Sequence, residues 1–191
     1  MTLADLTLGG DPANGSLITV DAGGDITLNE SEIQTLDAVS FTAEGDIHLG
    51  VRATVENSIT ATAGATDGTG SITGDIYTDL ITLADDGSIT LAAGSDNGSI
   101  TFAQANLQTD DLDITSGAQS GDIDFDESII TTGDTLTMTA EGGYAHLTQG
   151  PVIGTTLTAR SRNGVVVENM EFTTASAEAT GTGDIVLTSM G

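Results

Sequence analysis

The chain has 191 residues, enough for one large domain, and its 29 acidic side chains against 3 basic ones give a net charge of −26. This charge excludes binding to nucleic acid, which requires a basic surface, and it also excludes attraction to anionic lipid. Cations, cationic surfaces and neutral glycans remain as partners. Aromatic residues make up only 3% of the chain. A core of thin stacked coils filled by aliphatic residues is therefore favoured over an ordinary globular core, which usually contains more large aromatic side chains.

One motif, Gly–Asp/Ser–Ile/Leu–polar–apolar, recurs along almost the whole chain, and each copy predicts a turn followed by a short strand. In chain order, the clear copies begin at Gly15, Gly24, Gly45, Gly70, Gly87, Gly98, Gly121 and Gly183, and the weaker ones at Gly133, Gly154 and Gly164. The copies lie roughly 10 to 13 residues apart or at twice that interval, which indicates a repeat protein whose units must stack to bury their apolar faces.

Alternation within each copy assigns its side chains to two faces. In the copy at 121–126, Ile123 and Phe125 point one way, and the three aspartates between and beside them point the other. Alternation of this kind over four or five residues is typical of a half-buried strand. Since no window shows a helical stripe, and glycine and threonine are frequent, almost no helix is expected.

The motif favours an all-β parallel β-helix, or β-solenoid, over an antiparallel sandwich. Asn14–Gly15, Asp86–Gly87 and Asn97–Gly98 would suit hairpin turns. However, Gly-Asp/Ser precedes nearly every strand, for which hairpins give no reason. With two copies per coil, we predict about eight or nine coils in one solenoid domain spanning 1–191.

The runs LADDGSITLAAG (83–94) and GDIVLT (183–188) resemble the repeats of filamentous haemagglutinin-type exoproteins, which are bacterial adhesins exported by two-partner secretion. The resemblance covers roughly residues 10–190. It implies a right-handed β-helix that acts as a stiff shaft in adhesion or extracellular matrix, at the bacterial cell surface or outside the cell. The implied partners are neighbouring solenoid repeats and host or matrix glycans or proteins.

The ends of the chain predict either a segment of a longer repeat protein or a filament subunit. The last motif stops shortly before Gly191 with no polar cap after it, and uncapped coils expose strand edges that pair with other chains. Stacking of the protein on itself is therefore an alternative function. No apolar run approaches the ~20 residues that span a bilayer, so no membrane insertion is expected.

Aspartates provide the candidate metal ligands. Among those that directly follow a glycine are Asp25, Asp46, Asp75, Asp122, Asp134 and Asp184. Stacked on neighbouring coils, such carboxylates would repel by about 1 kcal/mol per pair, a cost that calcium would remove. The densest clusters, and the candidate calcium ligands, are Asp110 and Asp111 and then Asp122, Asp124 and Asp126. No cofactor is required, and calcium is the one considered.

The same two clusters carry an alternative of another class, a polysaccharide-active β-helix enzyme with two catalytic carboxylates. Against it, the chain has three arginines, two tyrosines and no tryptophan to hold acidic sugars or stack on rings. His48 and His146 both occupy the polar phase of their strands and are expected to face solvent. We therefore predict that the protein is not an enzyme.

Threonine tracts at 60–62, 135–139 and 156–158 suggest the hydroxyl rows of ice-binding β-helices. Those rows must recur on every coil, and here the tracts are expected to be scattered and interrupted by charge. Threonine is also simply a good strand residue, so strand formation explains the tracts better.

Overall fold

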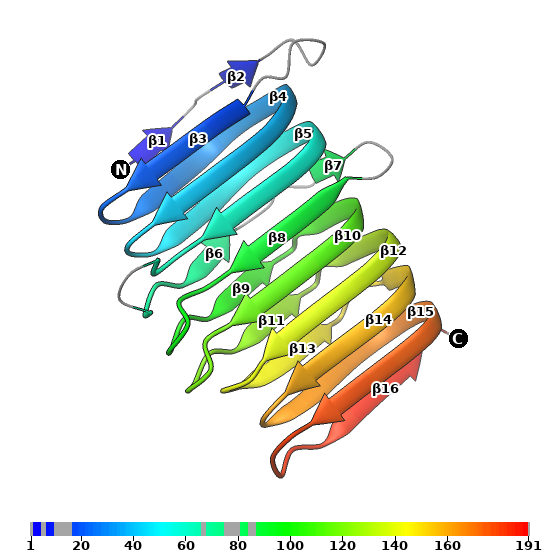
Figure 1. Cartoon of the computed structure of the whole chain (residues 1–191). Helices are drawn as coiled ribbons and strands as arrows, with labels where there is room; N and C mark the ends of the chain where they lie inside the picture. Colours follow the sequence, from blue (N-terminus) through cyan, green and yellow to red (C-terminus); the bar gives the residue numbers. More distant parts are fainter. Residues whose placement is uncertain are drawn as a thin grey trace.

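The computed structural model describes residues 2–4, 7–9, 17–65, 68–74, 81–83 and 87–190, and these form strands without any helix (Figure 1). The strands are β1 (Thr2–Ala4), β2 (Thr7–Gly9), β3 (Leu17–Ala22), β4 (Ile26–Ala43), β5 (Ile47–Thr62), β6 (Ile72–Gly74), β7 (Ile81–Leu83), β8 (Ser88–Ala92), β9 (Ile100–Ala103), β10 (Asn106–Ser116), β11 (Ile123–Asp126), β12 (Ile129–Ala140), β13 (Tyr144–Thr148), β14 (Val152–Ser161), β15 (Gly164–Ala179) and β16 (Ile185–Ser189).

The predicted parallel β-solenoid is confirmed. The described strands belong to one 16-stranded sheet, and their pairings are parallel. The chain winds through about 7 turns, slightly fewer than the eight or nine predicted. At about 4.8 Å per coil, the stack is about 34 Å long.

Two faces of each coil carry the features described below, and a further stacked segment, which includes β2 and β7, connects them along the chain. One short strand per coil lies on the face that we call the short face, formed by β6, β9, β11, β13 and β16 together with the first residues of β4, β5 and β15. The other, the long face, consists of β3, β8 and the second halves of β4, β5, β10, β12, β14 and β15. In Figure 1 the long face is nearer to the viewer and β9, β11 and β13 lie behind it.

The core between the faces consists of ladders of like residues. On the short face, the register stacks an aliphatic column that consists of Ile26, Ile47, Ile72, Ile100, Ile123, Ala145, Val165 and Ile185. All but the last are fully buried, and burial of one such side chain contributes about 1.5–3 kcal/mol. The next inward position holds Phe102 and Phe125, whose stacked ring centroids lie 5.1 Å apart. Gly74 leaves room for Phe102, since a Cβ there would lie 2.9 Å from its ring.

The glycine of the motif is required by stacking. A Cβ on Gly121 would overlap the carbonyl oxygen of Gly98, and a Cβ on Gly98 would in turn overlap that of Gly70. Positive φ does not explain these glycines, because among described glycines it occurs only at Gly64, Gly68 and Gly164. The motif therefore repeats because each coil passes directly over the backbone of the coil before it.

Candidate functional site

The structure separates the two aspartate clusters. Asp122, Asp124 and Asp126 lie in or directly before β11, which pairs with β9 and β13 on the short face. Asp110 and Asp111 lie in β10, which pairs with β8 and β12. The five carboxylates thus do not form one group, and among the described residues no three His, Asp or Glu side chains gather as metal ligands. Calcium binding and the absence of catalysis stay predictions.

The position after the motif glycine on the short face forms a hydrogen-bonded column, which we call the ladder. Its members in coil order are Asp25, Asp46, Ser71, Ser99, Asp122, Tyr144, Gly164 and Asp184. Asp75 lies outside the described residues, and Asp134 lies in β12, away from the ladder.

The Asp and Ser side chains of the ladder from Asp25 to Asp122 each accept a hydrogen bond from the backbone N–H of the next coil. The Ser71 N–H donates to Asp46 Oδ1 at 2.8 Å, and the Tyr144 N–H donates to Asp122 Oδ1 at 2.8 Å. Serine does the same, because the Asp122 N–H donates to Ser99 Oγ at 3.1 Å. A structural bond between coils thus explains why the motif accepts either Asp or Ser.

Two of the other candidate carboxylates, those of Asp126 and Asp111, also accept hydrogen bonds from side chains of the protein. Asp126 Oδ1 accepts from Gln149 Nε2 at 2.8 Å and from Thr148 Oγ1 at 3.1 Å. Asp111 Oδ1 accepts from Thr135 Oγ1. These bonds join neighbouring coils. Together with Asp122, three of the five candidate aspartates thus form hydrogen bonds between coils.

A corner of the solenoid, absent from the sequence prediction, has left-handed backbone on four successive coils. Gln104, Glu127, Gln149 and Asn169 have φ values of 58°, 48°, 62° and 52°. The first three directly follow β9, β11 and β13, Asn169 lies within β15, and Gln104 Nε2 donates to Glu127 Oε2 at 2.8 Å. Positive φ is uncommon for Gln and Glu, and here it repeats because each coil makes the same bend on the coil beneath.

The long face carries a hydroxyl array, and our expectation that the threonine tracts are scattered is wrong. Its outward positions, coil by coil, are Ala38, Ser40 and Thr42; Ser58, Thr60 and Thr62; Ser88, Thr90 and Ala92; Asp111, Asp113 and Thr115; Thr135, Thr137 and Thr139; Thr156, Thr158 and Arg160; Thr174, Ser176 and Glu178. The expected interruption by charge is present at Asp111, Asp113, Arg160 and Glu178. Unequal loop lengths hid this register from the sequence.

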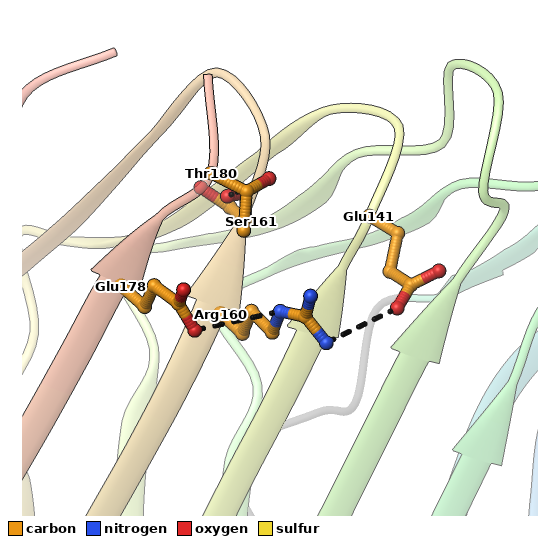
Figure 2. Close-up of polar contacts among 5 residues, drawn as sticks. All are labelled: Glu141, Arg160, Ser161, Glu178 and Thr180. Carbon is orange, nitrogen blue, oxygen red and sulfur yellow. Dashed lines mark hydrogen bonds and ion pairs between the residues drawn. The ribbon is translucent and has the colours of Figure 1, made fainter. Parts of the chain in front are cut away.

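Arg160 bridges acids of the two neighbouring coils (Figure 2). Its Nη1 lies 3.5 Å from Glu141 Oε1, and its Nε lies 3.6 Å from Glu178 Oε2. The three side chains are at least half exposed, so each pair contributes about 0–1 kcal/mol. Beside them, Thr180 Oγ1 donates to the Ser161 carbonyl at 3.2 Å and joins the last turn to the coil before it.

A shallow hollow of about 420 Å³ opens on the outside of the short face near the end of the rod. Its lining consists of Tyr144, His146, Asn163, Gly164, Val166, Thr182, Gly183, Asp184 and Val186. The Tyr144 and His146 rings lie with centroids 5.1 Å apart at 43°. His48 lies in the same column, and its Nδ1 is 3.3 Å from Thr73 Oγ1. Both histidines occupy outward, half-buried positions, and the sequence prediction missed the hollow beside one of them.

The final coil leaves apolar residues uncovered. Ile185 is 46% exposed, although its register partner Val165 is fully buried. On the long face, Leu157 is fully buried and its partner Ala175 is exposed. These side chains occupy the register positions of core residues, although they are exposed.

No family model, no curated protein and no solved structure matches the chain. The resemblance to filamentous haemagglutinin-type repeats therefore stays a prediction from the residues. No helix capable of crossing a bilayer occurs among the described residues.

Proposed function

We propose that the protein is a stiff structural shaft of a bacterial cell-surface or secreted exoprotein, of the filamentous haemagglutinin type, which acts in adhesion or extracellular matrix. The unbroken parallel register from Ile26 to Ile185 is the observation that supports it most. Every coil is hydrogen-bonded to its neighbours along the whole rod. Bending the rod therefore requires several columns of hydrogen bonds to break at once.

The acidic surface suits this role. A net charge of −26 keeps a β-rich rod soluble and repels other copies laterally, which protects its edges from unwanted pairing.

Labelling of cells tests the proposed place of action. Antibodies raised against the purified chain should label intact, unpermeabilised cells of the producing bacterium or detect the protein in its medium. Labelling that requires permeabilisation would overturn the proposal. As a readout of shape, small-angle scattering of the chain should give a stiff particle with a long axis of at least about 34 Å.

The uncovered final coil favours a second candidate, a filament subunit that stacks end to end. At the other end, Ile18 and Val20 of β3 also point toward the core and are only partly buried. The two ends of the rod thus both present inward aliphatic side chains that a second copy would cover.

Light scattering after size-exclusion chromatography tests this candidate over a concentration series. Ala177→Lys places a charge at an inward position of the final coil, and Ser176→Lys places the same charge at the adjacent outward position. We expect assemblies that grow with concentration for the wild type and Ser176→Lys, and a monomer for Ala177→Lys. A wild type that stays monomeric at every concentration would exclude stacking.

A further inference from the structure

The hollow beside Tyr144 exists because the ladder is interrupted there. Tyr144 takes the position that Asp or Ser occupies in earlier coils, and Gly164 takes the same position in the next coil. Gly164 therefore adds no side chain between Tyr144 and the next ladder residue, and 44% of Tyr144 is exposed. Gly164 has a φ of 144°, a backbone conformation that residues with a side chain rarely adopt. This position of the ladder therefore favours glycine.

The dimensions of the gap follow from the coil repeat. Asp184 occupies the ladder position one coil beyond Gly164. With about 4.8 Å per coil, Tyr144 and Asp184 are separated by about 10 Å along the rod. A six-membered sugar ring with its hydroxyls is short enough for this spacing, and Gly164 and Gly183 are among the residues that line the hollow.

The lining combines an apolar floor with hydrogen-bond acceptors. Val166 and Val186 provide apolar surface next to the Tyr144 ring. Asn163 lines the hollow and donates from its Nδ2 to the Gly142 carbonyl at 3.3 Å, and its amide Oδ1 is by its chemistry a hydrogen-bond acceptor. The carboxylate of Asp184 and the hydroxyl of Thr182 complete the polar rim.

This combination matches the surface of a pyranose, which has one face of C–H groups and a rim of hydroxyl donors. Aromatic rings bind such C–H faces, and a few placed polar groups orient the ligand. Acidic sugars are disfavoured because the hollow contains Asp184 and belongs to a chain of net charge −26.

We infer that the hollow lined by Tyr144, His146 and Asp184 is a binding site for one neutral pyranose unit of a glycan. The inference rests on the proposed function, in which the shaft is exposed to glycans outside the cell. One shallow hollow binds a monosaccharide with a dissociation constant in the millimolar range, so several rods acting together would supply useful avidity.

Saturation-transfer NMR tests the site on the purified chain, with the methyl glycosides of glucose, galactose, mannose and N-acetylglucosamine as probes. At least one should receive saturation at its ring C–H protons. Tyr144→Ser, which restores the ladder residue found at Ser71 and Ser99, should weaken binding about tenfold or more. His146→Ala and Asp184→Asn should also weaken it.

His48→Ala is the matched control, because His48 lies in the same column but outside the hollow, and it should bind as the wild type does. Circular dichroism verifies that each variant keeps its β-structure. The inference is overturned if no glycoside in the panel receives saturation, if binding survives Tyr144→Ser, or if choline is bound in place of the sugars. Each of these results leaves the antibody labelling of cells unaffected, so the two proposals fail separately.

Discussion

The same three residues, Gly-Asp-Ile, occur in an inner coil at 121–123 and in the final coil at 183–185, with different outcomes. Ile123 is fully buried, whereas Ile185 is 46% exposed. Asp122 accepts the Tyr144 N–H, whereas no such bond to the side chain of Asp184 forms among the described residues. The comparison shows that the motif does not determine its own burial: each coil is completed by the coil that follows it.

The largest expected effect is the loss of a core side chain in the inner coil. Ile123→Ala should lower the free energy of unfolding by about 2–5 kcal/mol, because it leaves a cavity between Ile100 and Ala145. Ile185→Ala should cost less than about 1.5 kcal/mol, since much of that side chain already contacts water. Urea unfolding of both variants measures the difference, and equal losses would contradict the comparison.

Substitution of the motif glycine is expected to have the next largest effect on stability. Gly121→Ala should cost about 1–3 kcal/mol, because its Cβ would overlap the backbone of Gly98 and Gly117. Gly24 begins the same motif in the first described turn of this column, where a Cβ would find no atom within 4 Å. Gly24→Ala should therefore be neutral or raise stability by about 0.4–1 kcal/mol. Thermal unfolding separates the two, and a destabilised Gly24→Ala would argue against stacking as the reason for glycine.

The ladder bond is expected to contribute less. Asp122→Ala removes the acceptor of the Tyr144 N–H and should cost about 1 kcal/mol. Asp122→Ser should recover most of this loss, as Ser99 already accepts the corresponding bond from the Asp122 N–H. Asp184→Ala should leave the unfolding midpoint unchanged. If Asp122→Ser were as unstable as Asp122→Ala, the interchange of Asp and Ser would need another explanation.

The smallest effect belongs to the exposed ion pairs. Arg160→Ala should lower stability by no more than about 1 kcal/mol, since it leaves Glu141 and Glu178 without their shared cation. Arg162→Ala removes the same charge from an exposed turn and controls for the change in net charge. The difference between the two variants should shrink in 1 M salt, where such pairs are screened. A difference that persists at high salt would indicate packing by the Arg160 stem instead.

Much of the fold could be predicted from the motif. Alternation around Ile123 and Phe125 correctly assigned inward and outward positions, because one face of each strand must be buried. The motif could not show which copies stack on which. Gly87-Ser88-Ile89 lies on the long face and Gly98-Ser99-Ile100 on the short face, although their sequences are alike.

The sites were less predictable, because a site depends on register between coils. The dense cluster at Asp110 and Asp111 lies close to Asp122 in sequence but on a different part of the coil. Conversely, Tyr144 and Asp184 are far apart in sequence and share one column. The available signal was a tyrosine at a ladder position followed one coil later by glycine, which can be recognised only once the coil length is known.

The stacking of Ile100 directly on Ile123 also bears on how such a rod can change in length during evolution. Removal of residues 100–122 would join Ser99 to Ile123 and bring Phe125 next to Gly74, where Phe102 now fits. A whole coil can thus be lost or duplicated without a new sequence at the junction, because each register position finds an equivalent partner. Rods of this kind can evolve in steps of one coil, with the spacing between attached parts adjusted by about 4.8 Å at each step.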